Sequence, residues 1–226
     1  ERSFFGASRL YNENTPLSKR NHFTIYNALP PGFSIVRENR SFVRPITIGV
    51  VSRLEEIKGM DLVVPAFAQV KKQYPDTRLV VVGDGSLRTK MQRQAQEFDC
   101  TEYVEWAGRQ PQERLMEWYR RMDIVLMPSR SEGFGLTAIE AMANGCVVVA
   151  SRTGGLPEVV QDGEVGLLHE ADSIDDMANK IISLIATPEL LQKYSSEAIR
   201  YVRRYSFERY SQLFNDLYKR LITTKR

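Results

Sequence analysis

Short apolar runs alternate with longer segments of helical periodicity along most of this chain. A short apolar run between turn residues is typical of a strand buried on both faces, whereas apolar residues three and four positions apart are typical of a helix packed on one face. The runs predict strands at residues 22–27, 46–52, 78–82, 103–106, 124–127, 147–150 and 166–168. The periodic segments predict helices at 60–74, in a stretch ending at 98, at 112–121, from 136 to the glycine at 145, and at 157–160, 173–185, 188–204 and 207–222.

This alternation of strands and helices predicts an α/β fold. Parallel neighbouring strands need a crossover connection such as a helix, and these crossovers are right-handed, so the alternation implies one Rossmann-like parallel sheet with helices on both faces. Residues 1–21 are polar and are broken by Pro16, and their pattern assigns no firm element, although Phe4, Phe5, Leu10 and Tyr11 could form a short packed helix.

Length and composition narrow the class of protein. The chain has 226 residues and a net charge of +3, which leaves room for a substantial core and does not indicate a nucleic-acid partner. Two cysteines are too few for a disulfide framework and are expected to be free thiols of a cytoplasmic protein. The sequence contains no signal peptide and no apolar run near the ~20 residues of a membrane helix. It begins with Glu1 rather than Met, so we expect a fragment or a processed form.

The stretch from Pro128 to Ala150 is predicted to be the functional centre. A buried strand leads into a loop with two glycines, then into an alanine-rich helix and the next strand. Such a loop lies at the carboxyl end of its strand, where open α/β sheets bind ligands, and the start of the helix offers backbone N–H groups to an anion. Two carboxylates, Glu132 in the loop and Glu140 in the helix, are separated by seven residues.

Basic residues follow the first predicted core strand. Arg53 and Lys58 stand just before Gly59 and a predicted helix start, which suits two adjacent phosphates. An exposed basic pair beside two glutamates is the alternative interpretation. The later segment Gly83-Asp84-Gly85 lacks the third glycine of a dinucleotide fingerprint, because Arg88 takes that place.

Metal-dependent and hydrolytic chemistry lack a recognisable pattern. The two histidines, His22 and His169, have no cysteine, histidine or carboxylate cluster at ligand spacing, and there is no Asp-x-Asp segment. No Gly-x-Ser-x-Gly segment is present either. We therefore predict no metal site.

The Glu132–Glu140 spacing and its glycine loop closely resemble the Glu-x7-Glu motif of retaining glycosyltransferases of the GT-B fold, in glycosyltransferase family four. The resemblance runs from about Thr24 to Leu221. It implies one half of a GT-B fold, with a nucleotide-sugar-binding domain at 22–205. Residues 1–21 would be a remnant of the interdomain region, and the helix at 206–226 would cross to an N-terminal domain.

The resemblance also implies roles for single residues. Arg53 and Lys58 would grip the donor diphosphate, Glu132 would hydrogen-bond the donor sugar near the reacting carbon, and Glu140 would bind the ribose hydroxyls. Backbone groups of the loop would hold sugar hydroxyls and phosphate; these belong to Gly133, Phe134, Gly135 and Leu136. Arg109 would meet the base through its backbone, and Gly83 would contact the nucleotide or serve only as a turn. Gly154, Gly155 and Glu158 match a family segment, although a turn followed by a helix-start acid explains them equally well.

The implied function is a retaining, metal-independent transfer from a UDP-, GDP- or ADP-sugar to a saccharide or lipid-linked acceptor, in polysaccharide or glycoconjugate biosynthesis. The acceptor would be held mainly by the N-terminal domain, so this chain alone is expected to bind donor without transferring it. A cytoplasmic location, with peripheral contact at the inner face of the membrane, would suit the basic last helix. The alternatives are a nucleotide-sugar-binding regulatory module, an epimerase or phosphorylase on the same fold, and a nicotinamide oxidoreductase, which the missing glycine disfavours.

Overall fold

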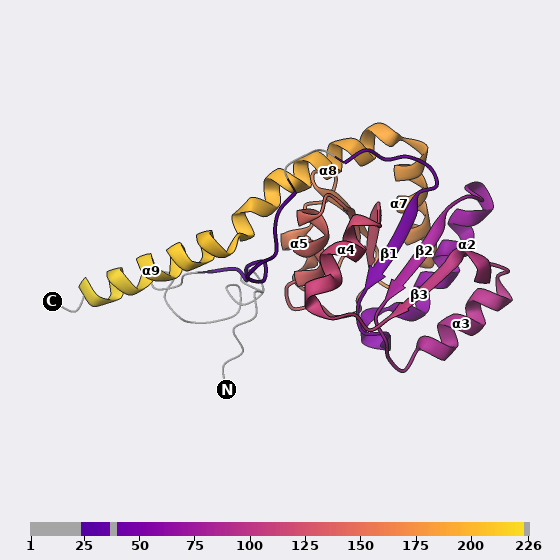
Figure 1. Ribbon diagram of the computed structural model, residues 1–226, viewed down its shortest axis with the longest axis horizontal. Coiled ribbons are helices and arrows are strands. Elements are labelled where there is room, and N and C mark those ends of the chain that lie inside the picture. The colour runs from indigo at the N-terminus through magenta and orange to yellow at the C-terminus, as the bar shows by residue number, and fades with distance from the viewer. Residues whose placement is uncertain (1–23, 37–39, 224–226) are drawn as a thin grey trace.

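The protein is built around a six-stranded parallel sheet. A computed structural model describes residues 24–36 and 40–223 (Figure 1). The strands are β1 (Thr47–Val51), β2 (Arg78–Val82), β3 (Val104–Gly108), β4 (Ile124–Met127), β5 (Val147–Ser151) and β6 (Gly166–His169). Their order is β3-β2-β1-β4-β5-β6, and every neighbouring pair is parallel. The predicted α/β fold is therefore confirmed.

The order of the strands reverses between β1 and β4. From β1 the chain builds outward through β2 to β3, and it then returns to place β4 on the other side of β1, with Ile48 opposite Ile124. The connections that leave the carboxyl ends of β1 and β4 therefore diverge to opposite sides. In open α/β sheets this divergence leaves a crevice in which ligands bind.

Helices cover both faces of the sheet, as their apolar periodicity predicts. The helices are α2 (Val63–Gln73), α3 (Arg88–Glu97), α4 (Leu115–Arg120), α5 (Leu136–Ala143), α6 (Leu156–Val159), α7 (Ile174–Ala186), α8 (Pro188–Val202) and α9 (Phe207–Thr223). One core lies between the sheet and α2, α3 and α7. A second core lies between the opposite face and α4, α5 and α6, and α8 contributes to both. Short 3-10 turns at η2 (Glu56–Lys58), η3 (Met60–Leu62), η4 (Thr101–Tyr103), η5 (Gln112–Arg114) and η6 (Arg203–Tyr205) complete the elements.

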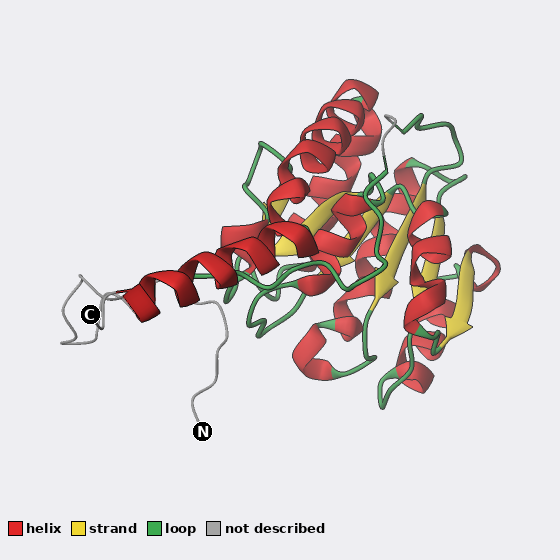
Figure 2. Cartoon of the chain, turned by 60° about the vertical axis from the view of Figure 1, so that its left-hand side comes forward, coloured by secondary structure: helices red, strands yellow, loops and turns green. Residues whose placement is uncertain are grey.

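The last helix stands apart from these layers. In the views of Figures 1 and 2, α9 extends away from the sheet toward the C-terminus. Aromatic rings follow one another along it, with the Tyr210 and Phe214 centroids 4.7 Å apart. Phe207, Tyr218 and Ile222 are exposed. The predicted helix is thus present, and its apolar residues are only partly covered by the rest of the domain.

The strand predicted at 22–27 is wrong in the part that the structure describes. His22 and Phe23 lie outside the described residues, and residues 24–27 have no regular secondary structure. The segment packs on aromatic rings instead of joining the sheet: Tyr26 stacks on Phe134 at 5.9 Å between centroids, and Leu29 N donates to Tyr205 O at 2.8 Å. The residue pattern was compatible with a strand, but this segment contacts the β4–α5 loop and η6 and pairs with no strand of the sheet. The leader predicted at 1–21 also lies outside the described residues.

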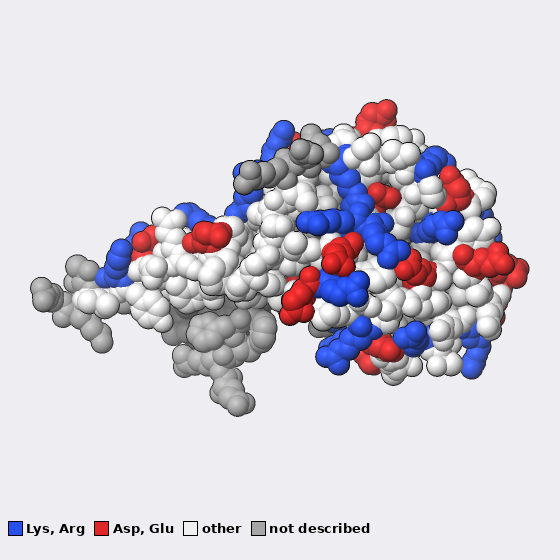
Figure 3. All heavy atoms as spheres, viewed as in Figure 1, with Lys and Arg blue, Asp and Glu red and all other residues white. Residues whose placement is uncertain are grey.

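Surface and thiol features agree with the composition. Lys and Arg side chains are interspersed with Asp and Glu over the face seen in Figure 3. Several of them are paired, including Arg121 with Glu105 and Arg40 with Asp123. Cys100 and Cys146 are buried free thiols. In the part of the chain that the structure describes, no helix has the length and apolar character needed to cross a membrane.

Gly83 holds the carboxyl ends of three strands together. Its φ of +136° and its surroundings exclude a side chain, since a Cβ there would lie 1.8 Å from the carbonyl oxygen of Ser52. Its own N–H donates to Gly108 O at 2.8 Å. Gly83 is therefore a close-packing residue between the ends of β1, β2 and β3.

We expect Gly83→Ala to lower the free energy of unfolding by about 3 kcal/mol or more, because backbone must move to admit the methyl group. Gly163 is the matched control: its φ is +75° and nothing lies within 4 Å of a Cβ there. Gly163→Ala should cost only about 1–2 kcal/mol, the strain of a left-handed alanine. Urea denaturation of both variants measures the difference, and equal losses would contradict the close-packing role.

Candidate functional site

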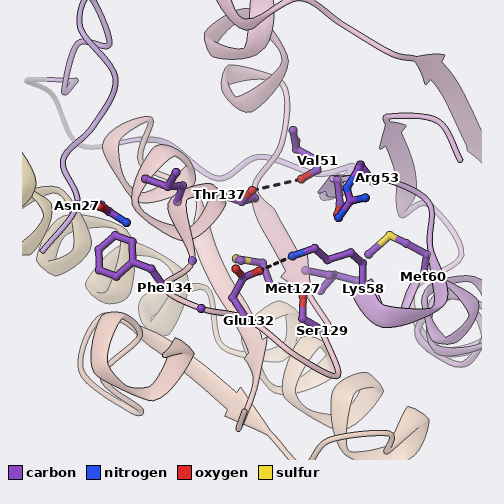
Figure 4. A pocket seen from close by; sticks show the side chains of 15 residues that line it. Asn27, Val51, Arg53, Lys58, Met60, Met127, Ser129, Glu132, Phe134 and Thr137 are labelled. Atoms are coloured by element: carbon purple, nitrogen blue, oxygen red, sulfur yellow. Dashed lines mark hydrogen bonds and ion pairs between the residues drawn. The ribbon is translucent and has the colours of Figure 1, made fainter. Parts of the chain in front are cut away.

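A cleft of about 530 Å³ opens at the carboxyl ends of β1 and β4, where the strand order reverses (Figure 4). Its walls come from the β1–α2 connection, from β4 and the β4–α5 loop, and from the segment before the sheet. The lining residues are Asn27, Val51, Ser52, Arg53, Lys58, Met60, Leu126, Met127, Ser129, Glu132, Gly133, Phe134, Gly135, Leu136 and Thr137. The structure thus brings Arg53, Lys58 and the predicted glycine loop together in one cleft.

An ion pair joins the two walls of the cleft. Lys58 Nζ lies 2.8 Å from Glu132 Oε2, and the two side chains point toward each other in Figure 4. Both are mostly shielded from solvent, with side-chain exposures of 21% and 17%. A lysine ammonium has three N–H donors, so this ion pair leaves two of them for other acceptors. Lys58 can therefore bind an anion without releasing Glu132.

The turn that carries Lys58 rests directly on the opposite loop. Lys58 ends η2, and Gly59 follows in the left-handed conformation with φ +65°. A Cβ at Gly59 would lie 1.9 Å from the carbonyl oxygen of Pro128. Only glycine allows the two backbones to approach this closely, and the approach fixes where the lysine begins.

A pair of glycines supports the loop that carries Glu132. A Cβ at Gly154 would lie 2.0 Å from Glu132 O, and a Cβ at Gly155 would lie 2.4 Å from Gly133 O. Gly155 N donates to Glu132 O at 2.9 Å. Of the two interpretations of this segment, the turn is therefore present and it positions the loop. Glu158 Oε2 accepts a hydrogen bond from the Tyr26 hydroxyl at 3.0 Å.

The N-terminus of α5 points its backbone toward the cleft. Gly135 is the N-cap, with φ +101°, and Leu136 and Thr137 open the helix. First-turn N–H groups have no carbonyl partner inside their own helix, and they carry the positive end of its dipole. Phe134 is buried against Tyr26 and Tyr205, which anchors the loop. The loop therefore presents N–H donors from a fixed backbone.

Arg53 lines the same cleft and is exposed. The neighbouring Glu55 turns toward another loop, where it accepts hydrogen bonds from Ser86 N at 3.2 Å and Ser86 Oγ at 2.6 Å. These bonds, the side-chain one first, lower the pKa of Glu55. Glu55 thus ties the β1–α2 connection to the loop after β2 rather than pairing with Lys58.

Glu140 lies outside the lining of this cleft, in the second core. It is 6% exposed and faces α4 and η5, where it accepts from the Tyr119 hydroxyl at 2.8 Å and from Gln112 Nε2 at 3.2 Å. Burial raises the pKa of Glu140, although both hydrogen bonds oppose the shift. A buried carboxylate held by two neutral donors is an unfavourable group to keep for structure alone.

The other two predicted contacts do not line this cleft and lie in the loops after β2 and β3. Gly83 follows β2, with the packing role described above. Arg109 is exposed in the β3–α4 connection, three residues before Gln112. This connection reaches α5 through the contact between Gln112 and Glu140.

Some residues of the site carried no signal in the sequence. Tyr119 and Gln112 contact Glu140 from 21 and 28 residues away, and nothing in their spacing indicates it. Asn27 reaches the cleft from the segment before the sheet. Among residues 24–36 and 40–223, no group of three or more His, Cys, Asp or Glu side chains could hold a metal ion.

Comparison with known proteins identifies the family of this chain. The family model of glycosyl transferases group 1 matches residues 34–201. A D-inositol 3-phosphate glycosyltransferase of Corynebacterium jeikeium is 33% identical over 185 residues, which cover 79% of this chain and 44% of that protein. The chain therefore spans less than half the length of this relative.

Solved structures share the fold. The C-terminal domain of a glycosyl transferase group 1 family protein (LpcC) from Francisella tularensis has a TM-score of 0.66 and 29% identity, covering 72% of this chain and 87% of that one. Anabaena HepE in complex with UDP has a TM-score of 0.70 and 25% identity, covering 77% of this chain and 48% of that one. The sheet is thus the Rossmann-like half of the GT-B architecture. With a cleft at the switch point, a glycine loop at α5 and a family model that matches most of its length, the chain belongs to the glycosyl transferases group 1 family.

Proposed function

We propose that this chain binds a nucleoside diphosphate sugar in the β1–β4 cleft and forms the donor half of a retaining, metal-independent glycosyltransferase. The observation that carries the proposal is the ion pair of Lys58 and Glu132 across a cleft that also contains Arg53 and the N-terminus of α5. A diphosphate needs cations and N–H donors, and a sugar needs hydrogen-bond acceptors beside them. Here both kinds of group lie in one cleft.

The diphosphate is assigned to Arg53, Lys58 and the first turn of α5. The arginine supplies a planar fork, the lysine supplies the two donors that its pair with Glu132 leaves, and the helix supplies N–H groups and its dipole. Glu132 then lies next to the distal phosphate, where the donor sugar begins. That location suits a carboxylate that accepts from sugar hydroxyls.

The chemical step that this arrangement can assist is departure of the diphosphate. Negative charge builds on the leaving oxygen, and fixed cations and N–H donors stabilise it in the transition state. No metal is required for this role when Arg53 and Lys58 neutralise the phosphates. We assign no enzymic nucleophile, so retention would follow from acceptor attack on the face that the diphosphate leaves.

The ribose is assigned to Glu140. Its two present partners, Tyr119 and Gln112, are neutral donors, as ribose hydroxyls are. Gln112 is exposed on η5 and can turn away to admit a hydroxyl, whereas the buried Tyr119 keeps the carboxylate oriented. The base would then lie toward Arg109 and Gly83. The Corynebacterium jeikeium relative is named a D-inositol 3-phosphate glycosyltransferase, and for this protein we propose an acceptor of the saccharide or lipid-linked class.

The acceptor is proposed to bind mainly on an N-terminal domain. The partly covered apolar residues of α9 suit a helix that crosses to such a domain, because an amphipathic helix needs a second surface. They are Phe207, Tyr210, Leu213, Phe214 and Leu217. Contact of the basic C-terminal region with the inner face of a membrane stays part of this proposal.

Donor binding can be tested on this chain directly, by calorimetry with UDP, GDP, ADP and their glucose and mannose conjugates in buffer that contains EDTA. We expect one nucleoside diphosphate to bind well above the others, because one pocket receives the base. Absence of binding by every ligand, or binding only after Mn²⁺ is added, would contradict the proposal.

Two variants connect that binding to the cleft. Lys58→Ala and Arg53→Ala should each weaken the preferred diphosphate by about 1.5–3 kcal/mol, the range for hydrogen bonds to charged groups. Lys72→Ala is the matched control, since Lys72 is exposed on α2 and does not line the cleft. It should leave the affinity unchanged.

Substitutions of the two glutamates should differ in which ligand they weaken. Glu140→Gln should weaken the diphosphate and its sugar conjugate by a similar factor, roughly ten-fold, because the ribose is common to both. Glu132→Gln should weaken mainly the sugar conjugate. Titration of both ligands into both variants measures the two ratios, and equal losses throughout would show that the roles are misassigned.

Although Glu140→Gln should weaken ligand binding, it should stabilise the folded protein at neutral pH. The folded state raises the pKa of Glu140, so this group favours folding most below its unfolded pKa, and that contribution is lost as the pH rises through the folded pKa. Glutamine resembles the protonated acid and does not titrate. As the pH rises from acidic values to 7, the free energy of unfolding of Glu140→Gln should therefore increase relative to that of the wild type. Urea denaturation of both proteins at an acidic pH and at pH 7 measures this change. Glu113→Gln, at an exposed site on η5, is the control and should change stability by less than about 0.5 kcal/mol at either pH.

A further inference from the structure

Arg130 makes the most extensive set of ion pairs and hydrogen bonds near the cleft without lining it. It lies two residues before Glu132 and is 25% exposed. Its guanidinium donates to both oxygens of Asp61, at 2.8 and 3.1 Å, and to Asp172 at 2.6 Å. It also donates to the backbone carbonyl of Glu56. One side chain therefore joins three separate segments of the chain.

The partners of Arg130 bracket Lys58. Glu56 precedes the lysine in η2, and Asp61 follows it in η3. The backbone of Arg130 contacts the same turn, because its N–H donates to Ile57 O at 2.9 Å. Neither 3-10 turn has more than three residues, and turns this short have little stability of their own. Contacts from outside must therefore hold the lysine in place.

We infer that Arg130 is a positioning residue for the diphosphate site: it fastens the turn that carries Lys58 to the loop that carries Glu132. The inference rests on the proposed function, since it assigns Arg130 a part in presenting those two groups to a diphosphate. The separation of Lys58 and Glu132 is set by a backbone bond and by a rigid arginine fork, one on each side of the lysine. Arg130 itself does not line the cleft.

Arginine suits this role better than lysine. Its planar fork reaches both oxygens of one carboxylate while its remaining N–H groups bind Asp172 and Glu56 O, which a lysine ammonium cannot do in one geometry. Burial opposes ionisation of Asp61, but its hydrogen bonds to Arg130 outweigh that effect and lower the pKa of Asp61. The ion pair of Arg130 and Asp61, here called the arginine clamp, therefore stays charged at neutral pH.

The chain contains a matched control for this clamp. Arg152 also bridges two carboxylates, Asp162 at 2.7 Å and Glu170 at 3.4 Å, in the connection after β5. It does not line the cleft. An effect that came only from losing an arginine clamp, or from general loss of stability, should appear in Arg152→Gln as well as in Arg130→Gln.

The test is calorimetric titration of wild type, Arg130→Gln, Arg130→Lys, Asp61→Asn and Arg152→Gln with UDP, GDP or ADP, whichever wild type binds best, well below each melting temperature. Arg130→Gln and Asp61→Asn should weaken binding roughly ten-fold, which is within the usual range of coupling between contacting groups. The affinity of Arg130→Lys should lie between the affinities of these two variants and that of the wild type. Arg152→Gln should bind within about two-fold of wild type, because the ion-pair partners of Arg152 are Asp162 and Glu170 and neither lines the cleft.

A double-mutant cycle separates positioning from stability. If Arg130 presents Lys58, then Lys58→Ala should weaken binding several-fold less in the Arg130→Gln background than in wild type, because the lysine is already displaced. A purely structural loss would leave the two effects multiplicative.

Wild-type affinity in Arg130→Gln, or a multiplicative cycle, overturns this inference and leaves the proposed function standing. Failure of the wild type to bind any nucleoside diphosphate overturns the proposed function, and this inference with it. If Arg130→Gln does not fold, Asp61→Asn completes the same cycle, since it keeps the contacts of Arg130 with Asp172 and Glu56.

Discussion

The pairing of β1 with β4 is the constraint on which the rest of the structure depends. These two strands are central and parallel, so their carboxyl ends meet at one edge of the sheet, and their connections must leave in opposite directions. Neither connection can fill the space above the pair. The cleft is therefore a consequence of strand order, and the residues that follow β1 and β4 become its walls: Arg53 and Lys58 on one side, Glu132 and the glycine loop on the other.

Backbone contact between loops turns this opening into a defined site. Gly59 lies against Pro128 O, and the glycines at 154 and 155 lie against the carbonyls of Glu132 and Gly133. At each position a side chain would collide with backbone, which cannot rotate away as a side chain can. The loops are therefore closely packed, as the core is, and this packing holds Lys58 Nζ 2.8 Å from Glu132 Oε2. In the proposed function, a diphosphate would meet this ordered site, and little conformational entropy would be lost on binding.

The sequence by itself determined most of the elements and their order along the chain. The strands Arg78–Val82 and Ile124–Met127 were predicted with the bounds that the structure has, because a strand buried on both faces must be apolar almost throughout. The local pattern also located Arg53, Lys58 and the loop at 132–136, since each follows a recognisable strand. It misjudged residues 24–27, where contacts with Phe134 and Tyr205 decided the conformation.

Only the tertiary structure decided which side chains meet. The contacts of Glu140 with Tyr119, of Lys58 with Glu132 and of Arg130 with Asp61 join residues 21, 74 and 69 positions apart. The burial that raises the pKa of Glu140 likewise comes from α4 and η5, which the pattern of its own helix does not encode. No periodicity spans such separations, because periodicity reports which face of an element is buried and not what packs against it. Those contacts follow from strand order and crossover handedness, which bring distant loops to one edge of the sheet.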